Sequence, residues 1–329
     1  MSTRVVFPEG THDTILRACR IMVDEGIATP IIVGDSEEIR VTGERLGLEL
    51  GGVSVVDPSR SPRYEAYVEE YFRMRARRGV TRDVARLRLA RPGHFATMML
   101  RSGDADMMSP GGTTHYPESV RTVLEVIGPA PGVGRLSGLH MVLLPKQVYF
   151  MADCALNIDP TAEDLAEIAL LSARTVRLLG IEPRVAMLSF SNFGGSEHPL
   201  ARKVRRATAI LRERAPDVIA EGEMQVATAL DGAFRRRYFP FSELQDDANV
   251  LIFPDLQSGS LALSLLNILS TFVAVGPLLM GIDRPVHPLR HGASVEDVVN
   301  LAALGAVVAA GQGSPGSFPT TGGAQTTTG

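Results

Sequence analysis

The sequence predicts an α/β protein with two domains. Short apolar runs alternate with amphipathic helical segments along most of the chain, a pattern typical of sheets covered by helices. Loops rich in Ser, Asn, Asp and Gly follow several of these runs. In α/β domains, ligands bind where such loops leave the carboxyl ends of strands. A chain of 329 residues corresponds to about two domains of ordinary size.

The first region alternates predicted strands and helices up to a break near residue 130. Its apolar runs predict strands at residues 5–7, 30–33 and 53–56. Its expected helices cover residues 13–25, 64–78, 81–90, 93–101 and 119–127. The loop at 104–114 is rich in Gly, Ser and Thr, which is typical of a loop that faces a ligand. The Gly/Pro-rich segment 128–132 predicts a crossing between domains.

The second region repeats this pattern, with predicted strands at residues 140–144, 148–152, 185–188 and 250–253. A helix is expected from Thr161 to Leu179, because its apolar residues recur at helical spacing. Thr161 and Asp164 fit a capping box at its start. Gly180, followed by Pro183, is typical of a helix end. A basic amphipathic helix is expected at residues 199–214.

An uncharged segment runs from residue 256 to residue 282. Its most apolar part, residues 261–280, is long enough to span a bilayer, but polar residues, Gly276 and Pro277 interrupt it. The segment therefore predicts a buried helix followed by a core strand at residues 273–279. We expect the apolar face of residues 261–271 to be covered, at a subunit interface.

The end of the chain is expected to return to the first domain. Residues 277–286 should make the return, and residues 294–310 should form the last helix. The predicted first domain is therefore residues 1–130 plus 278–310, and the second is residues 131–277. Residues 311–329 lack apolar periodicity and are expected to be a disordered tail.

Composition excludes several classes of function. A net charge of −4, 5% aromatic residues and no Trp argue against nucleic-acid binding. The N-terminus has no apolar signal core, so the sequence predicts a cytoplasmic enzyme without a membrane anchor. Cys19 and Cys154 are interpreted as small buried hydrophobic residues, not as a disulfide or metal site. A dehydrogenase is disfavoured, because no GxGxxG follows a strand and no carboxylate cluster suits a metal.

Six motifs occur in the order expected for a known family. They are FPEGTHD near the start, HYPESVR at 115–121, ADCALNIDPTAEDLAEIA, VAMLSFSNFG, IFPDLQSG and GASVEDVVNLAA. Together they resemble the phosphate acetyltransferase (phosphate acetyl/butyryl transferase) family over residues 4–310. Three of the motifs, PEGTH, HYP and SFSNFG, are most similar to the phosphate-acetyltransferase-like module at the C-terminus of bacterial NADP-dependent malic enzymes.

The resemblance implies a fold, a reaction and an assembly. The fold would place two α/β domains in an isocitrate/isopropylmalate-dehydrogenase-like arrangement, with the active cleft between them. The reaction would be acetyl-CoA + phosphate ⇌ acetyl phosphate + CoA, with acetyl-CoA and phosphate as substrates and no permanently bound cofactor. Family members are commonly homodimers. The alternative, drawn from the malic-enzyme branch, is a non-catalytic acetyl-CoA-binding module that regulates or assembles with a malic-enzyme partner.

The resemblance also implies roles for three charged residues. Asp297 would be the base that accepts the thiol proton of CoA, although Ser294 and Asp297 also fit a cap at the last helix. Arg75 and Arg121 would bind CoA or phosphate. Arg75 lies in a basic helix C-terminus, where a cation also complements the helix dipole.

Two polar loops are expected to line the cleft. Each follows a predicted strand, and their hydroxyl and backbone N–H groups could hold phosphate oxygens, although plain turns use the same residue types. The predicted binding residues of these loops are Ser189, Ser191, Asn192, Asp255, Ser258 and Gly259.

The chain departs from the family text at positions that would carry chemistry. Where relatives have Leu-Ser-Arg-Gly, this chain has Arg290 and His291 as the two central residues, and both are predicted to be catalytic. Pro110 stands where the family has a Ser, and it lacks a backbone donor. Losing one donor to a transition state costs about 3–4 kcal/mol, so the departures leave the non-catalytic alternative open.

Overall fold

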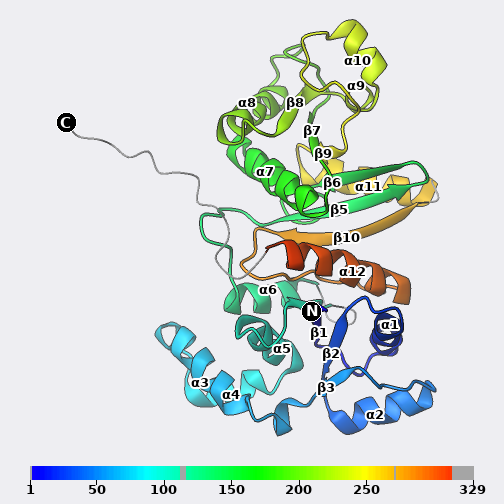
Figure 1. The fold of residues 1–329 in the computed structure, drawn as a ribbon. Coiled ribbons are helices and arrows are strands. Elements are labelled where there is room, and N and C mark those ends of the chain that lie inside the picture. The colour runs from blue at the N-terminus through cyan, green and yellow to red at the C-terminus, as the bar shows by residue number, and fades with distance from the viewer. Residues whose placement is uncertain (1, 112–115, 270–271, 313–329) are drawn as a thin grey trace.

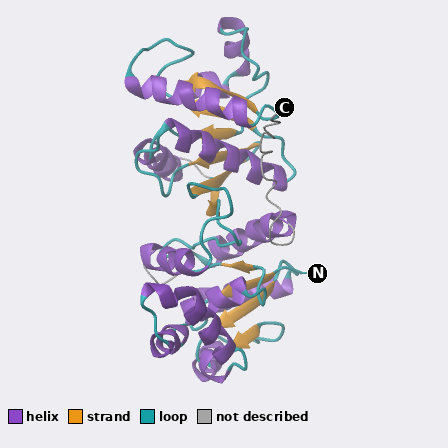
Figure 2. Cartoon of the chain, turned by 90° about the vertical axis from the view of Figure 1, so that its left-hand side faces the viewer, coloured by secondary structure: helices purple, strands orange, loops and turns teal. Residues whose placement is uncertain are grey.

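The computed structural model describes residues 2–111, 116–269 and 272–312. Two sheets lie in separate halves of an elongated molecule, each with helices on both sides (Figure 1, Figure 2). The first sheet has four parallel strands in the order β3-β2-β1-β4. Its strands are β1 (Arg4–Phe7), β2 (Thr29–Val33), β3 (Ser54–Val56) and β4 (Met107–Met108).

Side chains of the first sheet alternate between two cores, as the two-residue period of a strand requires. Val5 and Phe7 belong to the larger core, which also includes residues of α1 (Asp13–Asp24) and α12 (Val295–Gln312). Val6 faces a second core, formed with the helices of residues 64–126. Sequence periodicity predicted most of these helices. The helices before the domain crossing are α1 (Asp13–Asp24), α2 (Ser36–Arg45), α3 (Tyr64–Arg75), α4 (Arg82–Leu89), α5 (Pro92–Arg101) and α6 (Tyr116–Val126).

The second sheet has six strands in the order β10-β5-β6-β9-β7-β8. Strands β10, β5 and β6 are antiparallel, and β6, β9, β7 and β8 are parallel. Its strands are β5 (Ser137–Leu144), β6 (Gln147–Ala152), β7 (Arg184–Leu188), β8 (Ile219–Met224), β9 (Val250–Ile252) and β10 (Val273–Met280). The sequence analysis missed β8, because Glu221 and Glu223 interrupt its apolar run although both are buried.

The helices that the structure describes in the second half, before the last one, are α7 (Ala162–Leu178), α8 (Pro199–Arg214), α9 (Val226–Leu230), α10 (Gly232–Tyr238) and α11 (Leu256–Leu269). Helix α7 begins with the predicted capping box between Thr161 and Asp164. Alternation again divides the sheet. Val185 and Met187 belong to the core beneath α7, whereas Ala186 and Leu188 face the core that α11 helps to cover.

Helix α11 is not buried in a single copy of the chain, contrary to the prediction. It starts at Leu256, so the predicted loop around Ser258 is its first turn. Among its residues 256–269, as the structure describes them, only Gly259 is buried, and Leu265 and Ile268 are 59% and 82% exposed. The apolar side chains of α11 therefore form an exposed face in a single copy of the chain and are not part of its core. None of the described helices is long and apolar enough to cross a membrane.

The last helix, α12 (Val295–Gln312), packs between the two halves, against α1, α7 and β10. Strand β10 belongs to the second sheet as far as Met280, which is beyond the predicted domain boundary at 277/278. The chain then returns to the first half, where Ile282 pairs with Pro129 and Val286 with Met108. Helix α12 includes residues 311 and 312 of the predicted tail, and residues 313–329 lie outside the described residues.

Candidate functional site

Asp297 and Arg290 line a cavity of about 140 Å³ between the second sheet and α12. We call it the Asp297 cavity. The first turn of α12 and the loop before it form one wall, and β5, β10 and α11 form the others. Its lining residues are His140, Leu263, Asn267, Ala274, Val275, Gly276, Leu289, Arg290, Ala293, Asp297 and Leu301.

Asp297 is both a helix cap and a cavity residue. Its Oδ2 accepts hydrogen bonds from the Ser294 backbone N–H (2.9 Å) and from Arg290 Nη2 (2.9 Å), and its own N–H donates to Ser294 Oγ (3.1 Å). Burial acts to raise the pKa of Asp297, but the bonds from Ser294 and Arg290 outweigh it and lower the pKa. Asp297 is therefore a carboxylate at neutral pH, and the predicted cap with Ser294 is confirmed.

His140 also lines this cavity, and sequence reasoning missed it. It lies on β5, and its Nδ1 is buried without a hydrogen-bond partner among the described residues. Burial, with a smaller contribution from the Arg290 charge, lowers the pKa of His140 to about 4, so its imidazole is neutral. The apolar run around it predicted a strand, and no motif marked the imidazole. The predicted catalytic residue His291 is exposed and does not line this cavity.

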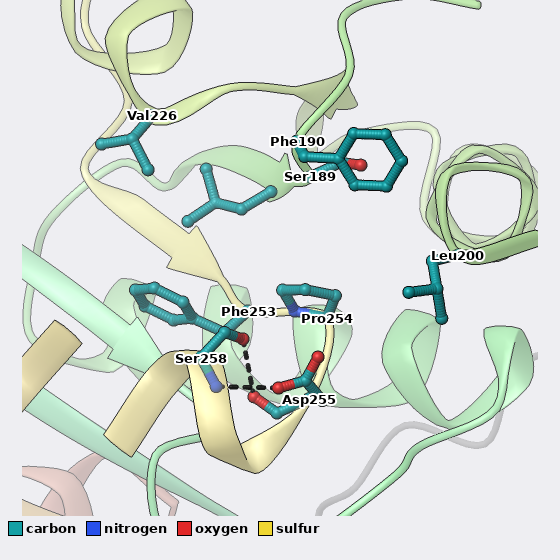
Figure 3. Close-up of a pocket in the computed structure, with 9 residues that line it drawn as sticks. Ser189, Phe190, Leu200, Val226, Phe253, Pro254, Asp255 and Ser258 are labelled. Carbon is teal, nitrogen blue, oxygen red and sulfur yellow. Dashed lines mark hydrogen bonds between the residues drawn. The ribbon is translucent and has the colours of Figure 1, made fainter. Parts of the chain in front are cut away.

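A second cavity, of about 280 Å³, lies at the carboxyl ends of β7 and β9. We call it the Phe190 cavity. Phe190, Leu200 and Val226 lie across it from Phe253, Pro254 and Asp255 (Figure 3). The remaining lining residues are Leu188, Ser189 and Ser258.

The Phe190 cavity includes three predicted binding residues, Ser189, Asp255 and Ser258. No Lys or Arg is among its lining residues. Asp255 Oδ1 accepts a hydrogen bond from the Ser258 backbone N–H (2.7 Å) at the start of α11. An apolar cavity with a carboxylate at its wall disfavours a phosphate group, because the two anions would repel each other. The predicted use of these residues for phosphate is therefore not supported by the lining.

Ser191 and Asn192 are engaged in holding their own loop to the end of β8. Ser191 Oγ donates to Glu223 Oε1 (3.2 Å), and Asn192 Oδ1 accepts from the Gln225 backbone N–H (2.8 Å). Gly259 has a packing role, because a Cβ there would lie 2.6 Å from the backbone oxygen of Asp153. Neither cavity is lined by these three predicted binding residues.

The structure separates the predicted arginines. Arg75 lies in the last turn of α3, with its Nε 3.3 Å from Glu125 Oε1. The same carboxylate pairs with Arg88 (2.5 Å) and Tyr71. Arg121 lies on α6 and is exposed. Neither Arg75 nor Arg121 lines either of the two cavities, so only Arg290 of the predicted cations lies beside Asp297.

A comparison with models of known protein families finds one that matches this chain. Residues 1–306 match the model of the family described as phosphate acetyl/butaryl transferase. The chain belongs to this family.

The curated relatives of this chain include phosphate acetyltransferases and NADP-dependent malic enzymes. The phosphate acetyltransferase of Bacillus subtilis (strain 168) is 37% identical over 93% of this chain and 94% of the relative. The phosphate acetyltransferase of Nitratidesulfovibrio vulgaris is 38% identical over 93% of this chain and 44% of the relative. The NADP-dependent malic enzyme of Escherichia coli (strain K12) is 41% identical over 93% of this chain and 41% of the relative. The chain thus spans less than half the length of the last two.

Solved structures of phosphotransacetylases share the fold of this family member. The EutD phosphotransacetylase from Staphylococcus aureus has a TM-score of 0.89 and 31% identity, and a phosphotransacetylase from Streptococcus pyogenes has a TM-score of 0.88 and 35% identity. Both matches cover 94% of each chain. A putative 4-hydroxythreonine-4-phosphate dehydrogenase from Salmonella typhimurium (TM-score 0.59, 13% identity) covers 94% of this chain and all of that one, and it shares the fold alone.

The two cysteines of this family member lie in the core, as the sequence predicted. Cys19 and Cys154 are buried and form no disulfide. Burial raises the pKa of both thiols, so both stay protonated at neutral pH and neither suits the role of a nucleophile. Among the described residues, no group of three or more His, Cys, Asp or Glu is placed to hold a metal ion.

Proposed function

We propose that this chain transfers an acetyl group between CoA and phosphate, in the reaction acetyl-CoA + phosphate ⇌ acetyl phosphate + CoA. Membership of the phosphate acetyl/butaryl transferase family supports this reaction. The observation that carries the proposal is the Asp297 cavity, where a charged carboxylate and the guanidinium of Arg290 lie together beside the half-buried His140 and buried apolar residues. An acetyl group could lie in this cavity while the thiol of CoA and the phosphate reach its carbonyl carbon from outside.

Asp297 has the role of base in the proposed reaction. When CoA attacks acetyl phosphate, the new bond joins the thiol sulfur to the carbonyl carbon, and the bond from that carbon to the phosphate oxygen breaks. The thiol proton passes to Asp297 and then to the departing phosphate. Proton transfer from a free thiol (pKa about 8.5) to a free carboxylate (pKa about 3.9) is unfavourable by about 6 kcal/mol, and the lowered pKa of Asp297 makes it more so. Proton transfer must therefore accompany carbon–sulfur bond formation. Arg290 would hold the carboxylate charged and attract phosphate.

The two other predicted arginines, Arg75 and Arg121, are proposed to bind the phosphate groups of CoA. Arg121 is exposed and therefore accessible to the phosphates of CoA, whereas Arg75 would have to exchange Glu125 for a ligand. The dehydrogenase-like arrangement of two domains and a cytoplasmic location remain proposals. No comparison supports the non-catalytic alternative, and a malic-enzyme partner stays a prediction.

A turnover assay tests the proposed reaction. Purified protein is mixed with acetyl-CoA and phosphate, and acetyl phosphate is measured together with free CoA thiol. We expect both products to appear at equal rates, and the reverse reaction to consume acetyl phosphate. If folded protein binds acetyl-CoA in calorimetry but forms neither product above buffer, the proposed reaction is wrong.

We further propose that the chain forms a homodimer through α11. The exposed apolar residues of this helix are Leu261, Leu265, Leu266, Ile268 and Leu269. No charged residue occurs between residues 256 and 282, so two copies related by a two-fold axis could meet here without like charges facing each other. A contiguous apolar face of this kind is typical of an interface.

A charged substitution tests this interface. We expect sedimentation of the wild-type chain to give a dimer, and the double substitution Leu265→Asp with Ile268→Asp to give a monomer, because a buried unpaired carboxylate is costly at an interface. Leu87→Asp is the matched control, since Leu87 is 67% exposed on α4 and should leave the dimer intact. A monomeric wild-type chain, or equal dissociation of the control, would contradict the proposal.

A further inference from the structure

His140 is a half-buried polar side chain of the Asp297 cavity that has no hydrogen-bond partner within the described part of the chain. It lies in the middle of β5, paired in the sheet with Met151 of β6, so its backbone position is fixed. Its Nδ1 is buried without a hydrogen-bond partner. No hydrogen bond involves its Nε2 within residues 2–111, 116–269 and 272–312, and the imidazole contributes to the cavity wall.

The other polar groups of the cavity are already engaged or lie in solvent. Asp297 accepts from Ser294 and Arg290, and the Arg290 side chain is largely exposed outside that ion pair. Asn267 is exposed on α11. His140 is therefore the neutral side chain of the cavity that is half-buried and forms no hydrogen bond within the described residues. Arg290 and Asp297 are the charged residues that line the cavity with it, since its remaining lining residues are uncharged.

The backbone around His140 makes room for its ring. A Cβ on Gly276, the neighbouring residue of β10 that also lines the cavity, would lie 2.9 Å from His140 Cδ2. Glycine at this position therefore lets the imidazole lie against the strand beside it. A volume of about 140 Å³ corresponds to roughly five water molecules at about 30 Å³ each. That space fits an acetyl group and part of a phosphate, but not a whole CoA.

We propose that His140 is a further catalytic residue, whose Nε2–H donates a hydrogen bond to the carbonyl oxygen of the acetyl group in this cavity. The inference rests on the proposed function. The carbonyl oxygen gains negative charge as the carbon becomes tetrahedral, and a donor fixed by a strand stabilises that charge without reorganisation. No proton is transferred from His140, which keeps the Nε2–H tautomer throughout. The proton that moves is the thiol proton, which Asp297 accepts.

Two substitutions at His140 separate this role from a structural one. His140→Phe keeps an aromatic ring and removes the donor, and we expect kcat to fall by about 10²–10³-fold, with KM for acetyl-CoA changed by less than about threefold. His140→Gln restores an N–H donor at a similar distance from Cα, on a flexible side chain, and should raise kcat at least about tenfold above that of His140→Phe. Thermal unfolding of each variant shows whether the fold is intact.

A spectroscopic measurement makes the test independent of turnover. In protein labelled with ¹⁵N-histidine, the His140 signals are identified by their absence from His140→Phe. Acetyl-CoA, and separately acetyl phosphate, should shift the His140 Nε2 signal while Nδ1 keeps the shift of an unprotonated nitrogen. If wild-type protein turns over but His140→Phe keeps kcat within threefold, or neither ligand moves Nε2, the role of His140 is wrong. If Nε2 responds without turnover, the contact stands and the proposed reaction fails.

Discussion

Asp297→Asn is expected to lower kcat for acetyl transfer by about 10²–10⁴-fold, the usual contribution of a positioned general base. The amide cannot accept the thiol proton, but its oxygen can still accept the Ser294 backbone N–H that the carboxylate now binds at 2.9 Å. The cap is therefore kept, and the melting temperature should change by only a few degrees. Steady-state kinetics in both directions, with acetyl-CoA affinity measured by calorimetry, check this result.

Ser294→Ala is the matched control for the cap. It removes the hydroxyl that accepts the Asp297 N–H and should cost about 1 kcal/mol of stability, while leaving the carboxylate and its Arg290 partner in place. Its kcat should stay within a few-fold of wild type. If Ser294→Ala lowers kcat as much as Asp297→Asn does, Asp297 acts as a cap and its role as base is wrong.

Glu223→Gln is expected to lower the free energy of unfolding by about 2–3 kcal/mol. The Glu223 side chain is 0% exposed, and its Oε2 accepts from Arg205 Nε at 3.0 Å. Its Oε1 accepts from the Gly194 backbone N–H (2.9 Å) and from Ser191 Oγ. Removing one partner of a fully buried pair costs about 3–5 kcal/mol. The cost here is smaller, because Arg205 is partly exposed and keeps its second partner, Glu197.

The pH dependence of this loss has a definite sign. Burial acts to raise the pKa of Glu223, but the Arg205 and Gly194 hydrogen bonds outweigh it and lower the pKa. The stabilisation by Glu223 is therefore fully present above the pKa of an unfolded glutamate, about 4.3, and is lost as pH falls through the lower folded value. Urea unfolding of wild type and Glu223→Gln at pH 7 and near pH 3 should show the difference shrinking in acid.

Glu197→Gln is the matched control, because Glu197 pairs with the same Arg205 (3.0 Å) but is 73% exposed. Exposed ion pairs contribute about 0.2–1 kcal/mol, so this variant should be nearly as stable as wild type. If Glu197→Gln and Glu223→Gln lower the free energy of unfolding equally, the buried Glu223–Arg205 pair does not stabilise the loop that carries Ser191 and Gly194 more than an exposed pair would.

The sequence predicted most of the alternating elements, because local periodicity and caps determine them, but it did not predict α2, β4, β8, α9 or α10. Thr161 and Asp164 gave the start of α7, and Ser294 and Asp297 gave the start of α12. The resemblance to the family brought attention to Asp297 and Arg290, which the structure places in one cavity. These predictions depend on contacts between residues close in the chain.

Contacts between distant segments were not predictable from the same signals. His140 and Asp297 come from β5 and α12, and no spacing relates them. From the sequence, Glu223 would be expected at the surface, as most glutamates are. It is buried in the structure because its carboxylate pairs with Arg205. The apolar composition of α11 is compatible with a helix in the core and with a helix at a subunit interface, so the sequence alone did not distinguish the two. The polar residues of the two loops likewise did not indicate that the lining of the Phe190 cavity, as the structure describes it, contains no Lys or Arg.

The most direct test of the account is a crystal structure of the protein with acetyl-CoA. We predict that the thioester lies in the Asp297 cavity, with its sulfur within hydrogen-bonding reach of the Asp297 carboxylate, about 3 Å or one bridging water, and its carbonyl oxygen on His140 Nε2. Acetyl-CoA bound in the Phe190 cavity, or elsewhere with Asp297 contacting only Ser294 and Arg290, would contradict it.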